Sequence, residues 1–150
     1  MKLLFGLHAP TAGQILLDGQ AMEWRSSMDA IQHGLGMVQQ HFTLVETLSV
    51  IDNIMLGAEI TGPLDRLNRR EAISILERRL PSSHLAVPWE LPVSRLSVGQ
   101  KQRLEILKLL FRDSQILFLD EPTAVLTPAE IGDFFSVLRK LKADGRTIVL

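Results

Sequence analysis

Two adjacent carboxylates, Asp120 and Glu121, stand directly after the apolar run Ile116–Leu119, and Pro122 closes the stretch. An unbroken apolar run of this length is typical of a strand buried on both faces of a parallel sheet. Pro122 ends it because proline has no N–H group for a sheet ladder. Open α/β sheets bind ligands at the carboxyl ends of their strands, and both carboxylates stand at such an end.

The acidic stretch alone leaves two interpretations open. Buried carboxylates without a partner cost much free energy, so a cation, a basic side chain or water must accompany them. One interpretation is a Mg²⁺ site beside a base that activates water. The other is an acidic strand end that caps a neighbouring helix.

A second polar feature is the sequence LSVGQ at residues 96–100, which opens the most strongly apolar helical stretch of the chain. Ser97 and Gln100 have the spacing of a capping box, which needs no ligand. Alternatively, the Ser97 hydroxyl and the Gly99 N–H group lie at a helix N-terminus, where anions bind readily. Both interpretations can hold, because a capped N-terminus still presents free N–H groups.

Composition excludes several classes of protein. The 150 residues form one domain or part of one, and 46% hydrophobic residues suffice for a core. The net charge is −1, with 16 basic and 17 acidic residues and no block of like charge, so no nucleic-acid surface or polybasic anchor is indicated. The absence of cysteine excludes disulfides, thiolate catalysis and Cys-ligated zinc. The four histidines lack metal-ligand spacing: His8, His33, His41 and His84.

No membrane-inserted segment is expected. Nothing approaches the roughly 18 consecutive apolar residues of a membrane span. The opening Met1–Phe5 superficially resembles a signal peptide, but its apolar run is too short and no small-residue cleavage site follows. A cytoplasmic location is therefore the default expectation.

The elements that must position these groups alternate between strands and helices. We expect strands at Ile15–Leu17, Leu35–Val38, Ile116–Leu119 and Thr147–Leu150, the last also buried. We expect helices capped by Ser26 or Ser27, by Ser49, by Ser97 and by Thr127, another over Asn68–Leu80, and a helix end at Met1–Leu7. Thr127, Pro128 and Glu130 form a clear helix start with a capping box. The pattern indicates an α/β layered fold with an all-helical stretch over about residues 45–95.

Three features in fixed order carry a resemblance to a known family. They are Gln40 after a short strand, LSVGQ at 96–100, and ILFLDEPT at 116–123. The chain resembles the nucleotide-binding domain of ATP-binding-cassette (ABC) transporters over essentially all its residues. The resemblance implies a P-loop NTPase-like cassette with a parallel core sheet, a small antiparallel β region near the N-terminus, and a helical subdomain at about 45–95.

The resemblance also implies a role for each motif in ATP hydrolysis. The strand ending in Asp120 corresponds to Walker B, so Asp120 would hold Mg²⁺ through its water shell. Glu121 corresponds to the catalytic base. Gln40 corresponds to the Q-loop glutamine, which joins the Mg²⁺ or water site and senses the transmembrane partner. The signature residues Ser97, Gly99 and Gln100 would bind the γ-phosphate held by a second cassette in a head-to-tail dimer.

Two departures from the family pattern stand out. Val98 replaces the first glycine of the signature, and Thr127 ends the D-loop where aspartate is usual. LSVGQ with PTAVLT is most similar to the importers of simple sugars and nucleosides, and the chain would be the first of two cassettes. The resemblance then implies permease subunits as partners and a peripheral position on the inner face of the cell membrane.

The phosphate-binding loop of the family is not found, because no Gly-Lys pair occurs in the 150 residues. We expect a cassette cut at both ends, with that loop and the switch histidine outside the chain. Three functions stay open. They are the ATPase of an importer, a soluble ABC ATPase of DNA repair or translation, and a non-catalytic truncated cassette. The second is disfavoured because residues 45–95 show neither a coiled-coil insert nor basic segments.

Overall fold

The computed structural model describes residues 1–62, 64, 66–79 and 87–150. Its strands are β1 (Ile15–Leu17), β2 (Gln20–Met22), β3 (Leu35–Val38), β4 (Ile116–Leu119) and β5 (Thr147–Val149). Its helices are α1 (Ser27–Gln32), α2 (Val50–Met55), α3 (Arg69–Arg79), α4 (Val98–Phe111) and α5 (Pro128–Ala143), with a 3₁₀ turn η2 at Val93–Arg95.

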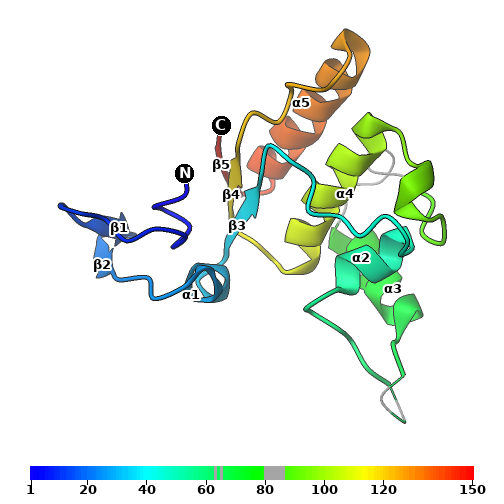
Figure 1. The fold of residues 1–150 in the computed structure, drawn as a ribbon, viewed down its shortest axis with the longest axis horizontal. Helices are drawn as coiled ribbons and strands as arrows, with labels where there is room; N and C mark the ends of the chain where they lie inside the picture. Colours follow the sequence, from blue (N-terminus) through cyan, green and yellow to red (C-terminus); the bar gives the residue numbers. More distant parts are fainter. Residues whose placement is uncertain (63, 65, 80–86) are drawn as a thin grey trace.

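The central sheet has the order β3-β4-β5, and both strand pairs are parallel. Parallel neighbours need a crossover, which here is the long segment from α2 to α4 before β4 and helix α5 after it. Figure 1 shows α1 and the β1–β2 hairpin on one side of this sheet, with α2, α3, α4 and α5 on the other. The family fold expected from the sequence, a parallel sheet with a small antiparallel hairpin and helices, is therefore confirmed.

Strand β4 is buried on both faces, as its apolar run predicts. Leu117 and Leu119 are fully buried in the larger core cluster, which they share with residues of α2, α4 and α5. Phe118 faces the opposite way and packs with Phe5 and Ala30 in a second cluster. The alternation follows from the period of two in a strand. It places the end of β4 in the middle of the fold, where Asp120 and Glu121 follow.

The N-terminal region contains two tight turns. Asp18 and Gly19 both have positive φ angles, 51° and 81°, which is the requirement of a type I′ hairpin between β1 and β2. At the start of the chain, the Leu7 N–H donates to the Lys2 carbonyl and the Gly6 N–H to the Leu3 carbonyl, at 2.9 and 3.1 Å. These two bonds have the pattern of a Schellman motif, but residues 2–6 form hydrogen-bonded turns and not a helix, so the helix end predicted for Met1–Leu7 is present only as turns.

The segment from 45 to 95 contains α2, α3 and η2, and its other described residues form loops, turns and isolated bridges, so it is helical only in part. Helix α2 packs on α4 and α3 through four buried apolar residues: Val50, Ile51, Ile54 and Met55. Helix α3 ends at Arg79, so the predicted contact of Leu80 and the loop residue Pro81 lie outside the described residues. Isolated bridges join Ser49 to Pro92 and Thr61 to Leu67.

One burial prediction was wrong. Thr147–Leu150 was expected to be a buried strand, but Thr147 and Leu150 are exposed and Ile148 and Val149 are half-buried. Strand β5 pairs with β4 on one side, and in the described residues its other edge has no strand partner. A strand at the edge of a sheet has a neighbour on one side only, so part of its backbone and of its side chains stays exposed to solvent.

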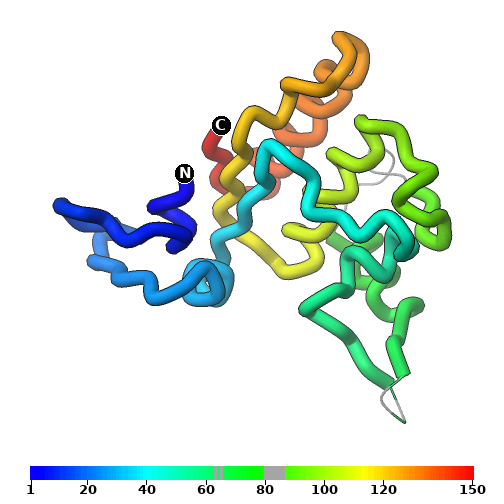
Figure 2. Tube along the Cα trace, in the orientation of Figure 1, coloured from blue at the N-terminus to red at the C-terminus, as the bar shows by residue number. Residues whose placement is uncertain are grey.

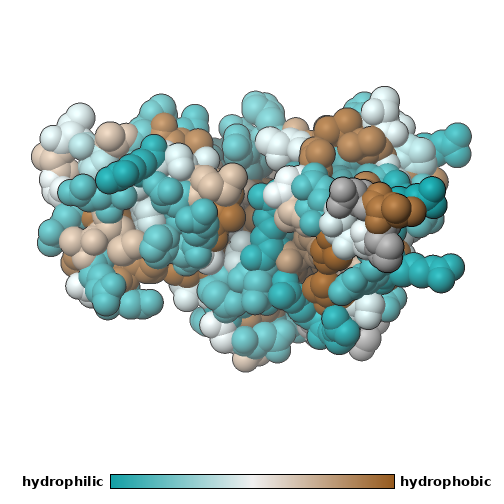
Figure 3. All heavy atoms as spheres, turned by 90° about the horizontal axis from the view of Figure 1, so that it is seen from below, coloured by the Kyte–Doolittle hydropathy of each residue, from teal (hydrophilic) through white to brown (hydrophobic). Residues whose placement is uncertain are grey.

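Both chain ends lie beside the sheet. Figure 2 traces the N-terminal residues to a position next to β5, and Met1 and Val149 pack against the same cluster. On the face shown in Figure 3, separate hydrophobic patches alternate with hydrophilic residues. Among the described residues, no helix is both long and apolar enough to traverse a lipid bilayer.

Candidate functional site

Gln40 and Glu121 meet at the carboxyl edge of the sheet. The parallel register pairs Val38 with Leu119, so the residues two positions further along each strand come to lie opposite each other. The side-chain amide of Gln40 donates a hydrogen bond of 2.8 Å to a carboxylate oxygen of Glu121. The structure therefore brings together the two residues that the sequence assigns to the water and metal side of the site.

Glu121 has an unusual backbone conformation. Its φ angle is +48°, in the left-handed region that side-chain-bearing residues rarely adopt. A residue before proline is normally extended, so the sequence gives no hint of this conformation. The Glu121 carbonyl accepts a hydrogen bond of 3.2 Å from the Ala124 N–H, which closes the turn after β4. Strained residues of this kind occur frequently at active sites, which suits a functional role for the carboxylate.

Asp120 extends the strand pairing by one residue. Its N–H donates to the Val38 carbonyl at 3.0 Å, and its side chain is half-buried beside the exposed Glu121. No group of three or more His, Asp or Glu side chains that could hold a metal ion is found in the described part of the chain. The side-chain oxygens at this edge are those of Asp120, Glu121 and the Gln40 amide. Mg²⁺ takes one or two carboxylates and keeps several waters, so this donor set fits that ion.

The start of α4 has the capping box expected of LSVGQ. The Ser97 N–H donates to the Gln100 side chain at 2.9 Å, and the Gln100 N–H donates to the Ser97 hydroxyl at 3.2 Å. This reciprocal pair is the predicted capping box. Ser97 and Val98 are exposed, whereas Gly99 is buried. The capped N-terminus therefore presents the Ser97 hydroxyl to solvent.

Gly99 is buried because the side chain of Glu130, on α5, packs against its backbone. A Cβ atom at position 99 would collide with the Glu130 carboxylate, so any larger residue there would force the Glu130 side chain out of its capping position. The backbone N–H and hydroxyl of Thr127, together with the backbone of Gly99, hold the pKa of the Glu130 carboxyl below its usual range. An ion pair of 3.2 Å between Arg103 and Asp133 joins the same two helices. The sequence indicated Glu130 only as a helix cap, and its contact with the signature was missed.

As far as the structure describes the chain, the signature residues are not hydrogen-bonded to the edge of the sheet where β3 and β4 end, which we call the acidic edge. No hydrogen bond of the described residues joins Ser97, Gly99 or Gln100 to Gln40, Asp120 or Glu121. The predicted site residues thus form two groups, one at the end of β3 and β4 and one at the start of α4.

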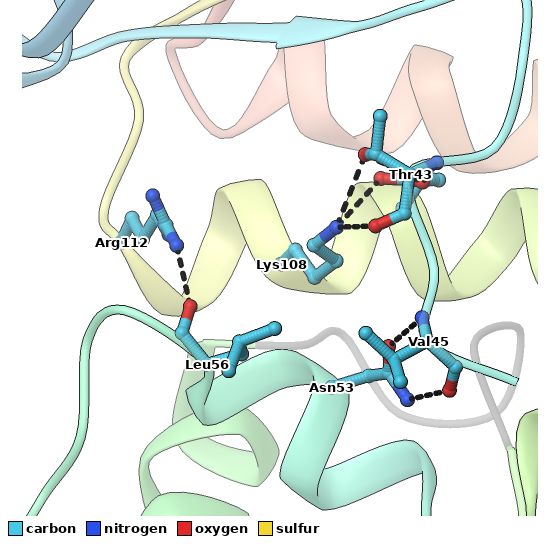
Figure 4. A network of polar contacts seen from close by, with 7 residues as sticks. Thr43, Val45, Asn53, Leu56, Lys108 and Arg112 are labelled. Carbon is cyan, nitrogen blue, oxygen red and sulfur yellow. Dashed lines mark hydrogen bonds and ion pairs between the residues drawn. The ribbon is translucent and has the colours of Figure 1, made fainter. Parts of the chain in front are cut away.

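The segment after Gln40 holds a polar network that the sequence analysis did not identify. Thr43 contacts two side chains of α4, the buried Glu105 and its neighbour Lys108. Figure 4 shows Lys108 reaching toward Thr43, and Asn53 of α2 paired with Val45. A charged pair inside an otherwise apolar helix face is the signal that could have pointed to these residues.

A comparison with protein families identifies the chain's relatives. The family described as ABC transporter matches residues 1–124. A putative carbohydrate transport ATP-binding protein of Mycoplasma pneumoniae is 43% identical over 158 residues, which cover 99% of this chain and 28% of that protein. A ribose import ATP-binding protein, RbsA 2, of Burkholderia cenocepacia is 41% identical and covers 99% of this chain and 29% of that protein. The chain thus spans 28% and 29% of the length of these two curated relatives.

Solved structures share the fold. MJ1267, an ATP-binding cassette of an ABC transporter in its ADP conformation, superimposes with a TM-score of 0.78 at 22% identity, covering 98% of this chain and 61% of that one. The cbiO1 protein of Clostridium perfringens, part of the ABC transporter complex cbiONQ, gives a TM-score of 0.75 at 29% identity, covering 98% of this chain and 58% of that one.

Proposed function

This chain belongs to the ABC transporter family, and on that basis we propose that it is the ATP-binding and ATP-hydrolysing part of an importer for a simple sugar or nucleoside. The names of its relatives refer to carbohydrate transport and ribose import, which supports a sugar as the transported solute. We further propose that the described helical segment within residues 45–95 is the helical subdomain of the cassette.

The acidic edge supplies the metal side of this function. Asp120 and the amide oxygen of Gln40 would hold Mg²⁺, with water and phosphate oxygens completing its shell. The ion would neutralise charge on the phosphate groups of ATP, which is a main part of catalysis in phosphoryl transfer. The half-buried position of Asp120 supports this role, because it limits the motion of the carboxylate.

Glu121 would orient the attacking water and accept its proton. Its carboxylate is exposed at the sheet edge and held by the Gln40 amide. The hydrogen bond leaves the second carboxylate oxygen free to accept from water. Gln40 therefore has two roles, since its nitrogen orients the base and its oxygen can face the metal.

The signature residues would serve a second cassette. Ser97, Gly99 and Gln100 stand at the N-terminus of α4, where a γ-phosphate can accept hydrogen bonds. Their separation from Gln40 and Glu121 supports a site completed by a head-to-tail partner. We propose that the chain acts on the inner face of the cell membrane, bound to permease subunits.

The single observation that carries this proposal is the Gln40–Glu121 hydrogen bond. The test is the Glu121→Gln variant of the natural protein that carries this sequence. We expect it to bind Mg-ATP as the wild type does and to hydrolyse it at least about a hundredfold more slowly, as removal of a general base typically does. Glu23→Gln, an exposed glutamate that follows β2, is the matched control and should hydrolyse normally. Wild-type turnover in Glu121→Gln would remove Glu121 from the role of base.

A second candidate is a cassette segment that does not hydrolyse ATP by itself. The observation in its favour is that no Gly-Lys pair occurs in the 150 residues, so the backbone cradle and lysine for the phosphates are missing from them. Titration of Mg-ATP into residues 1–150 tests it. We expect no high-affinity binding, and binding in the micromolar range would reject this candidate.

A further inference from the structure

Glu105 is a buried charge that the proposed mechanism does not use. Its residue is 4% exposed in the middle of α4, although glutamate is rarely so buried without a partner. Its carboxylate accepts hydrogen bonds from the Thr43 N–H at 2.7 Å and from the Thr43 hydroxyl at 3.2 Å. It also forms an ion pair of 3.2 Å with Lys108, one turn further along the helix.

Lys108 completes the contact from the same helix. Its ammonium group donates to the Thr43 carbonyl at 3.2 Å and lies 3.4 Å from the Thr43 hydroxyl. Both backbone polar groups of Thr43 are therefore bound by side chains of α4. We call Thr43, Glu105 and Lys108 the Thr43 clasp. Removal of one member of such a buried set leaves the other charge uncompensated, which makes the arrangement specific.

A second contact holds the chain two residues later. The side-chain amide of Asn53, on α2, accepts from the Val45 N–H at 2.8 Å and donates to the Val45 carbonyl at 2.9 Å. Figure 4 shows both contacts on the same extended segment. Residues 41–45 have no helix or strand of their own, so the segment is placed by these side chains together with Leu44, which packs against the core.

The Thr43 clasp lies close in sequence to Gln40. Three residue steps separate Gln40 from Thr43, and each step spans at most about 3.6 Å, so the two positions stay within ~11 Å of each other. Gln40 is bound at its other side to Glu121. Helix α4, which holds Thr43 at its middle, carries Ser97 and Gly99 at its start. The 14-residue helix α4 therefore carries the signature at its start and contacts Thr43, three residues after Gln40, at its middle.

We propose that Glu105 is a positioning residue, which acts through the Thr43 clasp to set the position of Gln40 against Glu121 relative to the signature helix. The proposal rests on the proposed ATPase function. Glu105 touches no nucleotide in this role. Its loss displaces residues 40–43, so the Glu121 carboxylate loses its orienting donor, while Asp120, water and the phosphate oxygens would still hold Mg²⁺ and the nucleotide.

The test is a double-mutant cycle in the natural protein, assembled with its permease, using Glu105→Ala and Gln40→Ala. We expect each single variant to lower kcat about tenfold with KM for Mg-ATP changed less than about twofold. If Glu105 acts through Gln40, the double variant should be no slower than Gln40→Ala alone. A merely structural role for Glu105 would give multiplied losses, and that result would overturn the proposal.

Two further variants distinguish a positioning role of Glu105 from a general effect on folding. Glu105→Gln keeps an oxygen that can accept from the Thr43 N–H, so it should retain most of the kcat that Glu105→Ala loses. Glu46→Gln is the matched control, because Glu46 also pairs with α4, at 2.9 Å through Lys101, but its side chain is 64% exposed. We expect it to hydrolyse ATP normally. Equal losses in Glu46→Gln and Glu105→Ala would contradict a specific role for the buried clasp.

Hydrogen exchange gives a readout that does not depend on catalysis. We expect amides of residues 40–45 to exchange faster in Glu105→Ala and at the wild-type rate in Glu46→Gln. Failure of the proposed ATPase function is visible separately, as absence of Mg-ATP hydrolysis by the wild-type protein. If the wild-type protein does not hydrolyse ATP, hydrogen exchange alone tests the proposal. Unchanged protection of residues 40–45 in Glu105→Ala would then show that Glu105 does not position this segment.

Discussion

The side-chain amide of Gln40 lies 2.8 Å from the carboxylate of Glu121, although 81 residues separate the two in sequence. The contact results from the register of β3 and β4, since Val38 and Leu119 are partners and both strands end at the same edge. One hydrogen bond therefore reports the relative position of two segments that reach the edge by different routes. Its donor follows β3, and its acceptor follows β4.

Replacement of Gln40 tests the importance of this bond. We expect Gln40→Ala to lower kcat at least about tenfold, because a hydrogen bond to a charged group contributes roughly 1.5–3 kcal/mol. Mg-ATP binding should be largely retained, because Asp120, water and phosphate oxygens would still hold the metal ion. The measurement is steady-state hydrolysis together with equilibrium nucleotide binding. Gln39→Ala removes an adjacent exposed amide and should leave kcat unchanged. Similar effects of both variants would contradict a specific role for Gln40.

Replacement of Gly99 tests the contact between the signature and α5. Gly99→Ala places a methyl group against the Glu130 carboxylate, so we expect a lower melting temperature. The double variant Gly99→Ala/Glu130→Ala should recover part of the loss, because the colliding carboxylate is gone. Gly132→Ala is the control, since a Cβ there meets nothing within 4 Å. This change in a helix interior should stabilise the protein by up to about 1 kcal/mol.

Acid should weaken the contact between α2 and α3. The hydrogen bond of 2.7 Å from Arg69 lowers the pKa of the Asp52 carboxyl from its ordinary value of 3.8, and Ser49 adds to this shift. A lowered pKa in the folded state means that the stabilisation is complete above about pH 4–5 and is lost as the pH falls through the folded pKa. Asp52→Asn should lower the stability slightly at neutral pH and flatten the acid limb of a stability profile measured by urea unfolding. An unchanged acid limb would exclude Asp52 as its source.

Truncation of β4 should be costly. Leu117 is fully buried in the larger core, so Leu117→Ala should reduce the free energy of unfolding by about 2–5 kcal/mol. Leu16→Ala is a matched change at a leucine of β1 that is 54% exposed, and it should stay within about 0.5 kcal/mol of the wild type. Denaturant unfolding measures both. Equal losses would mean that β4 is not at the centre of the core.

Local patterns predicted the elements of this fold well. The cap at Thr127 and the apolar run of β4 each depend on residues close together in sequence, and the structure contains both. The burial predicted for β5 was wrong because the burial of a strand depends on the elements that lie beside it. A run of apolar residues does not specify those neighbours.

The candidate site was predictable only in part. Gln40 and Glu121 could be paired because motif order placed both at strand ends. The contact of Glu130 with Gly99, and that of Glu105 with Thr43, each join residues from separate elements, and neither partner's sequence surroundings indicate the other. The backbone of Glu121 contradicts the preference of a residue before proline, so it too could not be read from local rules.

The left-handed backbone of Glu121 sets stability and activity against each other at a single position. A residue with a side chain pays roughly 1–2 kcal/mol to hold this conformation, and glycine does not. We therefore expect Glu121→Gly to fold more stably than the wild type and to be inactive. Laboratory evolution under heat alone would favour glycine at position 121, and only continued demand for turnover would keep glutamate there.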